Sequence, residues 1–311
     1  MIKAEGLSKR YGPLTAVDGI SFKVEPGEVL GFLGPNGAGK TTTMRMFAGF
    51  VPPSAGYAEI CGFRVDQHPI EAKTRLGYLP EGAPVYGEMT PWEFLDFCAA
   101  VRGFSGSERQ ERVGAAVERL NLESVRDRRI ETLSKGFKRR VGLAQAILHD
   151  PPVLILDEPT DGLDPNQKHE VRELIAAMSA NKIIVISTHI LEEVDAVCNR
   201  AIIIAAGRIV ADETPEKLIQ RSRYHNAVTI RFRDLDDLNA AAEALRALSA
   251  VAEVEIDRQG RRLTALPRDQ ALILSSVDEL VNARGWDIEQ LQLESGRLDE
   301  VFRRITTGEA L

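Results

Sequence analysis

A glycine-rich segment that follows a strongly apolar run constrains this sequence more than any other feature. Residues 29–33 predict a buried strand, and it leads directly into the run Gly34-Pro35-Asn36-Gly37-Ala38-Gly39-Lys40-Thr41-Thr42. This matches G-x-x-x-x-G-K-[ST] between a strand and a helix. Glycines let backbone N–H groups turn toward an anion, and the helix N-terminus adds positive potential. We expect Lys40 to reach the β- and γ-phosphates of a nucleotide and Thr41 to bind Mg²⁺.

A second apolar run ends in two acidic residues. Residues 153–156 predict a strand of a parallel sheet, and Asp157 and Glu158 follow it at the carboxyl end, where such sheets bind ligands. We expect Asp157 to hold Mg²⁺ and Glu158 to activate the attacking water as a general base. His189 follows another apolar strand, residues 183–187, and we expect its ring to contact the γ-phosphate or that water.

The segment from Leu133 to Phe137 predicts another anion-binding helix N-terminus. Ser134 and Gly136 come directly before an amphipathic helix, where a hydroxyl, backbone amides and the helix dipole converge. A chain with one nucleotide needs only one phosphate cradle, so we expect this second one to serve the nucleotide of a partner subunit.

Composition and hydropathy exclude several classes of protein. The 311 residues predict about two domains, and a net charge of −7 argues against a nucleic-acid-coating protein. The longest apolar runs are far shorter than the ~20 residues that cross a bilayer. Three scattered cysteines without C-x-x-C spacing indicate reduced, small buried side chains.

The composition and the hydrophobic periodicity of the sequence change near residue 221. Before it, β-rich runs alternate with helical patterns, which is typical of an α/β domain. Residues 222–311 contain twelve arginines, no lysine and sixteen acidic residues, and their periodicity predicts the order βαββαβ followed by a helix. We therefore expect an α/β nucleotide-binding domain, 1–221, and a small α+β ferredoxin-like accessory domain, 222–311.

Taken together, residues 1 to about 220 resemble the ATP-binding subunits of ABC transporters. The motifs that carry the resemblance are the Walker A loop (34–42), the signature (133–137), Walker B (153–158), the D-loop Gly162-Leu163-Asp164 and the switch histidine His189. The appended C-terminal domain and Gly77-Tyr78-Leu79-Pro80-Glu81 are similar to bacterial ABC-2 exporters, and Ser187-Thr188-His189-Ile190-Leu191 is similar to ATPases of gliding-motility and multidrug-export systems.

The resemblance implies an ABC cassette of the P-loop NTPase fold, with a mixed sheet and a helical subdomain at about 82–150. It implies an ATPase that works as a homodimer or heterodimer with a separate transmembrane permease, peripheral to the cytoplasmic face of the inner membrane. Each ATP would lie between Lys40, Thr41 and Asp157 of one subunit and Ser134 and Gly136 of the other, with Asp164 nearby. Tyr11 would stack on adenine, and Glu81 would contact Mg²⁺ or its water.

Some residues depart from the family pattern. Glu81 stands where a glutamine is usual, which adds negative charge near the γ-phosphate, and Lys135 and Phe137 replace the usual Gly and Gln of the signature. In the segment that would meet the membrane partner, Thr90-Pro91-Trp92-Glu93 predicts a capping box, and Met89 and Trp92 are candidates for a docking groove. The basic run 138–140 is interpreted as a solvated helix face.

Two other functions compete with an exporter subunit. A soluble ABC-type ATPase that acts on ribosomes or DNA would carry two cassettes or a long coiled-coil insertion, and neither is found here. A nucleotide-gated scaffold with little turnover is disfavoured by the presence of Glu158 and His189. No nucleic-acid partner is expected.

Overall fold

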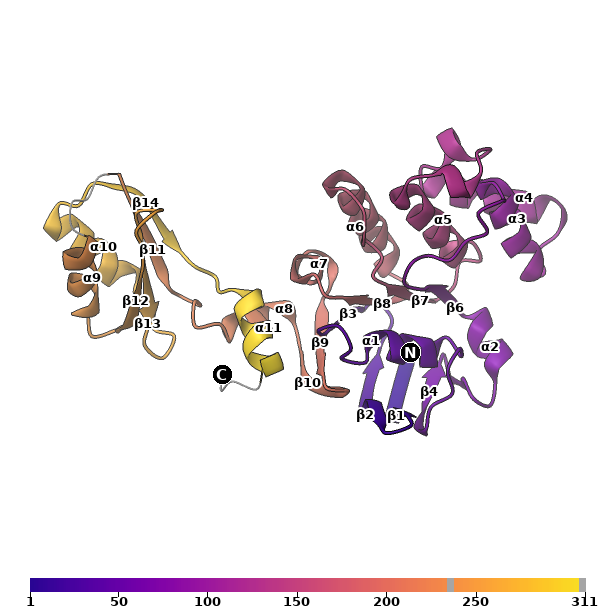
Figure 1. Cartoon of the computed structure of the whole chain (residues 1–311), viewed down its shortest axis with the longest axis horizontal. Coiled ribbons are helices and arrows are strands. Elements are labelled where there is room, and N and C mark those ends of the chain that lie inside the picture. The colour runs from indigo at the N-terminus through magenta and orange to yellow at the C-terminus, as the bar shows by residue number, and fades with distance from the viewer. Residues whose placement is uncertain (234–237, 308–311) are drawn as a thin grey trace. The chain divides into compact units, whose positions relative to one another are not determined.

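The computed structural model describes residues 1–233 and 238–307, which form two compact units (Figure 1). The first unit is Met1–Glu213 and the second is Thr214–Leu311. The sequence placed the boundary after residue 221, but helix α8 (Pro215–Gln220) packs against the last helix, α11 (Leu298–Thr307), and therefore belongs to the second unit. Residues 234–237 and 308–311 of the predicted 222–311 domain lie outside the described residues.

The first unit contains a mixed sheet of order β10-β9-β3-β8-β7-β6. All neighbouring strands are parallel except β10, which is antiparallel to β9. The strands are β3 (Val29–Leu33), β6 (Leu76–Leu79), β7 (Val153–Asp157), β8 (Ile183–Thr188), β9 (Arg200–Ala205) and β10 (Arg208–Glu213). Because β3, β7 and β8 are mainly apolar and are buried along their whole length, helices or a second sheet must cover both faces.

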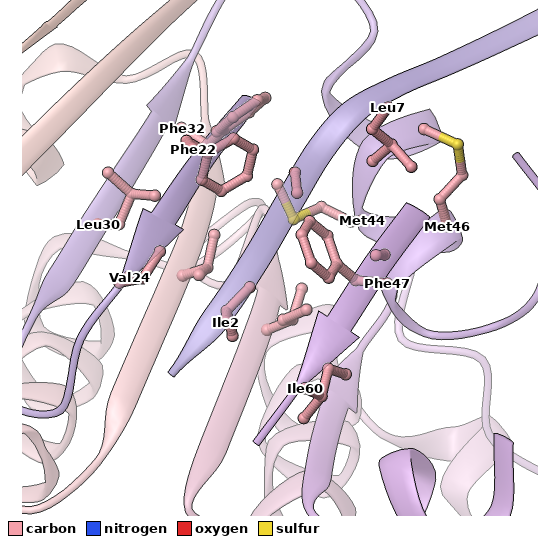
Figure 2. Packing of buried hydrophobic residues seen from close by; sticks show 14 of the residues in the cluster. Ile2, Leu7, Phe22, Val24, Leu30, Phe32, Met44, Met46, Phe47 and Ile60 are labelled. Carbon is pink, nitrogen blue, oxygen red and sulfur yellow. The ribbon is translucent and has the colours of Figure 1, made fainter. Parts of the chain in front are cut away.

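An antiparallel sheet of order β2-β1-β4-β5 supplies part of that cover. Its strands are β1 (Ile2–Tyr11), β2 (Leu14–Val24), β4 (Ala55–Ile60) and β5 (Phe63–Arg64). Helix α1 (Lys40–Phe47) and the two sheets share one hydrophobic core, in which Phe22 of β2 packs against Phe32 of β3 and Phe47 of α1 (Figure 2). The glycine-rich loop between β3 and α1 is thus fixed at both ends by buried side chains.

Further helices complete the first unit. They are α2 (Pro69–Thr74), α3 (Pro91–Val101), α4 (Gly106–Arg119), α5 (Lys135–Ile147), α6 (Pro165–Ser179) and α7 (Leu191–Val197), with 3₁₀ turns at Glu123–Val125 and Ile130–Thr132. Helices α3, α4 and α5 pack together as a helical subdomain (Figure 1). The expected capping box is present: Thr90 Oγ1 accepts from the Glu93 amide, and the Glu93 carboxylate accepts from the Thr90 amide.

After helix α8, the second unit has the predicted βαββαβα order. Its elements are α8, β11 (Val228–Phe232), α9 (Leu238–Arg246), β12 (Val251–Asp257), β13 (Arg262–Pro267), α10 (Leu274–Arg284), β14 (Ile288–Leu293) and α11. Within the described residues the strands form an antiparallel sheet of order β12-β13-β11-β14. Apolar residues of α9 and α10 pack on this sheet, which gives the α+β ferredoxin-like arrangement.

None of the helices in residues 1–233 and 238–307 combines the length and the apolar character needed to cross a bilayer.

Candidate nucleotide-binding site

The candidate site lies at the carboxyl edge of the parallel strands. Strand β3 leads into the glycine-rich loop, β7 ends at Asp157, β8 ends at Thr188 just before His189, and β6 leads through Pro80 to Glu81. Parallel pairing in register brings these ends together, with Leu33 beside Thr188 and Asp157 beside Ser187. Four segments that are distant in sequence therefore meet at one edge, where α/β sheets bind ligands.

Two glycines let the loop approach its surroundings closely. A Cβ on Gly34 would lie 2.5 Å from the carbonyl oxygen of Ile204, and one on Gly39 would lie 2.4 Å from that of Ala16. Gly39, the N-cap of α1, also has φ of 109°, which L-residues rarely adopt. Larger residues at either position would push the loop out of place.

Lys40 is folded into the loop that precedes it. Its ammonium donates to the carbonyl oxygen of Gly34 at 2.7 Å and to that of Pro35 at 3.3 Å, and the residue is only 6% exposed. Burial lowers the pKa of Lys40, and the negative charges of Glu158, Asp157 and Glu81 oppose that change. The cation thus lies at the loop centre and near the three acidic residues of the site.

The two carboxylate oxygens of Asp157 differ in their contacts. Its Oδ1 accepts from the Ser187 hydroxyl, while Oδ2 is buried without a hydrogen-bond partner among the described residues. Burial raises the pKa of Asp157, and nearby Glu81 adds to the increase, while the hydroxyl groups of Ser187 and Thr41 oppose it. A buried carboxylate oxygen without a partner is costly unless a cation or donor binds it.

That oxygen and the Thr41 hydroxyl suit Mg²⁺ in their chemistry. Mg²⁺ prefers oxygen ligands and usually takes only one or two from the protein, with the rest from phosphates and water. Residues 41 and 157 therefore fit a metal that arrives with a nucleotide.

Glu158 and His189 are brought within hydrogen-bonding distance of each other. Nδ1 of His189 lies 3.0 Å from Oε1 and 2.9 Å from Oε2 of Glu158. Glu158 has φ of 52°, an uncommon backbone conformation for a non-glycine residue, and its amide donates to the carbonyl oxygen of Ser187 at 3.0 Å. Uncommon backbone conformations cluster at functional sites.

Ser134, Gly136 and Asp164 form a separate group on neighbouring helix ends. Ser134 is the N-cap of α5 and Asp164 that of α6, where each side chain accepts from a backbone amide. A Cβ on Gly136 would lie 2.2 Å from Oε1 of Gln167, so α5 and α6 meet there, and the Lys135 side chain lies beside Gly162. The signature and the D-loop are therefore adjacent.

Tyr11 and Glu81 are both exposed. Tyr11 ends β1, is 47% exposed and has the Lys9 ammonium 5.1 Å from its ring centroid. Glu81 follows β6, and its charge acts on both Lys40 and Asp157.

The interpretation of residues 138–140 as a solvated face is wrong for both arginines. Arg139 and Arg140 are only 6% and 7% exposed. Buried guanidinium groups need partners: Arg139 donates to backbone carbonyl oxygens, and Arg140 pairs with Glu170 at 2.7 Å. Lys138 alone remains near the surface, where it donates to the carbonyl oxygen of Glu131.

Sequence reasoning also missed other residues that support the site. Ser187 donates to Asp157, and the hydroxyls of Thr160 and Thr188 both donate to the buried carboxylate of Glu193. Polar residues at the end of an otherwise apolar strand were a readable signal for Ser187 and Thr188. No local pattern distinguishes Glu193 from an ordinary helix-surface acid.

An apolar groove of about 530 Å³ lies between the helical subdomain and the sheet. Phe50, Tyr86 and Phe97 are exposed side chains along it, and Tyr86 packs edge-on against Phe97. The two sequence candidates for a docking groove are not among its lining residues: Trp92 instead stacks on Arg126.

Comparisons with known proteins agree with this geometry. A family model described as ABC transporter matches residues 17–161. The chain is 33% identical to the Nod factor export ATP-binding protein I of Ralstonia nicotianae over 99% of this chain and 94% of that protein. It is 31% identical to the linearmycin resistance ATP-binding protein LnrL of Bacillus subtilis over 98% of each chain. A solved structure described as an ATP-binding subunit of an ABC transporter superimposes with a TM-score of 0.66 and 31% identity, over 71% of this chain and 92% of that one.

Proposed function

The chain belongs to the ATP-binding subunits of ABC transporters of the exporter type, and from this premise we propose that it hydrolyses ATP with Mg²⁺ to power export through a separate transmembrane subunit. The observation that carries the proposal is the arrangement at the sheet edge. Glu158, paired with His189, lies next in sequence to Asp157, a buried carboxylate whose second oxygen has no hydrogen-bond partner within residues 1–233 and 238–307.

Lys40 and the loop bind the phosphates. The Lys40 ammonium exchanges its bonds to the carbonyl oxygens of Gly34 and Pro35 for bonds to phosphate oxygens, and the α1 N-terminus adds positive potential. Thr41 and Asp157 would hold Mg²⁺, with Glu81 near its water shell, and the bound ion would neutralise negative charge on the phosphates. Tyr11 stacks on adenine.

Glu158 then acts as the general base. Its carboxylate accepts a proton from a water molecule whose oxygen forms the new bond to the γ-phosphorus as the bond to ADP breaks. His189 donates to both carboxylate oxygens through Nδ1 and so fixes the orientation of the base.

A second subunit completes each site. Ser134 and Gly136 of one subunit contact the γ-phosphate bound by the other, and Asp164 approaches the same nucleotide from the adjacent D-loop. ATP favours the closed dimer because it makes contacts there that the open state lacks. Both homodimers and heterodimers suit this arrangement.

The transmembrane subunit docks on the apolar groove, which places the chain at the cytoplasmic face of the inner membrane. Exposed aromatic side chains lining a groove are suited to receive an apolar helix face. We expect Phe97→Glu, which puts a charge in the groove, to reduce co-sedimentation with membranes that contain the transmembrane subunit. Leu14→Glu, at another exposed apolar residue, is the matched control and leaves co-sedimentation unchanged.

The decisive test is phosphate release by the purified chain as a function of protein concentration. Turnover per chain should rise with concentration, because sites form only in dimers. Glu158→Gln should lower turnover ~10²- to 10⁴-fold and should sediment as a dimer in Mg²⁺-ATP.

Glu173→Gln serves as control, since that side chain is 69% exposed and pairs with His169 on α6. Absence of turnover at every concentration, together with no ATP-induced dimer of Glu158→Gln, would contradict the proposal.

A further inference from the structure

Arg139 is a buried cation beneath the acidic edge of the site. It lies on α5, one turn after the Ser134 N-cap, and its side chain points into the unit rather than to solvent. Burial lowers the pKa of Arg139, while the charges of Asp161, Asp157, Glu158 and Glu81 oppose that change. An arginine stays charged in proteins, so this position holds a permanent positive charge among carboxylates.

The hydrogen bonds of Arg139 reach backbone carbonyl oxygens next to Glu81 and on both sides of Glu158. Nη2 donates to the carbonyl oxygen of Asp157 at 2.8 Å, Nε to that of Pro159 at 3.3 Å, and Nη1 to that of Pro80 at 3.4 Å. Pro80 precedes Glu81, and Asp157 and Pro159 stand on either side of Glu158. One side chain therefore links the ends of β6 and β7 to α5.

These bonds bear directly on the backbone of Glu158. That residue has a positive φ of 52°, which surrounding contacts must hold in place. Arg139 binds the carbonyl oxygens of the residues immediately before and after it. A lysine would keep the charge, but its single ammonium lacks the planar fork that reaches three acceptors.

We infer that Arg139 is a positioning residue with two roles: it holds the Glu158 backbone in the geometry for hydrolysis, and it supplies the counter-charge for the carboxylate at position 81. The inference rests on the proposed hydrolysis for its first role and on nucleotide binding alone for its second.

The counter-charge is tested by affinity for ATP in EDTA, measured with a fluorescent ATP analogue, so that neither Mg²⁺ nor turnover contributes. Arg139→Gln should weaken binding about fivefold, because the tetra-anion then meets uncompensated carboxylates. Arg139→Lys should stay within about twofold of wild type. Adding Glu81→Gln to Arg139→Gln should restore the affinity to within about twofold of Glu81→Gln alone.

The positioning role is tested by steady-state ATP turnover of the same variants. Both Arg139→Gln and Arg139→Lys should lower kcat about tenfold or more with little change in KM, since the base is displaced rather than the substrate. Lys138→Gln, a change on the same helix at a side chain that donates to Glu131, is the matched control. Melting temperatures identify a variant that fails to fold, in which case Arg139→Lys carries the comparison.

An affinity that Arg139→Gln leaves unchanged, or a loss that Glu81→Gln does not reverse, would overturn the counter-charge. An unchanged kcat in Arg139→Lys would overturn the positioning role. If the wild-type chain binds ATP but does not hydrolyse it, the proposed function fails, and the affinity series still decides whether Arg139 compensates Glu81.

Discussion

Nδ1 of His189 lies within hydrogen-bonding distance of both carboxylate oxygens of Glu158, at 3.0 and 2.9 Å. The two residues come from different strands, since His189 follows β8 and Glu158 follows β7. A ring N–H shared by both oxygens fixes the plane of the carboxylate, and the direction of its lone pairs follows from that plane. The fold therefore fixes the orientation of the Glu158 carboxylate as well as its position.

Replacing His189 should therefore reduce the rate rather than the affinity. His189→Ala should lower kcat about 10- to 100-fold, because a misdirected base loses that much from a displacement of about 1 Å. The KM for ATP should change less than kcat. His169→Ala on α6, whose side chain is 71% exposed, is the control in the same turnover assay. An increase in KM with kcat unchanged would assign His189 to nucleotide binding alone.

The buried charge of Asp157 should lower the stability of the nucleotide-free protein. Burial raises the pKa of its carboxyl group, and Oδ2 is buried without a partner among the described residues, so the charged form destabilises the nucleotide-free protein. Asp157→Asn should raise the melting temperature by about 2–4 °C, which corresponds to about 1 kcal/mol for a unit of this size. The same variant should lose the Mg²⁺-dependent increase in ATP affinity.

Thermal unfolding without nucleotide checks the first effect, with Asp127→Asn, at a 78% exposed side chain, as control. A lower melting temperature for Asp157→Asn would mean that the bond from Ser187 outweighs the cost of burying the charge.

The parts of the site that could be predicted from sequence are those governed by local rules. An apolar run followed by Gly34–Lys40 or by Asp157 indicates a strand end, and parallel strands place their carboxyl ends at one edge. The roles of Arg139 and Glu193 depend on which helix faces turn inward, and a basic or acidic residue on a helix has the same local pattern whether it is solvated or buried. The domain boundary was missed for the same reason, since α8 is assigned by its packing on α11.

Two glycines of the loop should differ in their tolerance of alanine. Gly39→Ala combines φ of 109° with a Cβ placed 2.4 Å from the carbonyl oxygen of Ala16, so it should cost more than about 2 kcal/mol of stability and abolish ATP binding. Gly37→Ala has φ of 80° but meets nothing within 4 Å, so it should cost about 1 kcal/mol and keep measurable binding. Urea unfolding and ATP titration compare them, and equal losses in the two variants would contradict the role of close packing at Gly39.

Tyr11 should contribute to nucleotide affinity through its ring. Stacking of a base on an aromatic side chain is worth about 1–3 kcal/mol, so Tyr11→Ala should weaken ATP binding roughly 5- to 150-fold. Tyr11→Phe keeps the ring and should stay near wild type. Titration with ATP and with inorganic triphosphate separates the effects, because only ATP binding should respond. An equal loss for both ligands would place the role of Tyr11 in the fold of the loop.

Acid should destabilise the first unit through His149. Its Nε2 lies 3.1 Å from the carbonyl oxygen of Leu76, and burial, the largest cause, lowers its pKa from 6.5 to about 4. Between those values the unfolded chain binds more protons than the folded one, so stability is complete above pH 6.5 and is lost as the pH falls toward 4. From pH 7 to pH 5 the loss should be about 1–2 kcal/mol, after allowance for partial exposure of the ring.

Urea unfolding at pH 7 and pH 5 measures this loss, and His149→Gln should lose correspondingly less stability than wild type. His68→Gln, at a side chain 54% exposed, should behave like wild type. The same pH dependence in wild type and His149→Gln would assign the acid sensitivity to other groups.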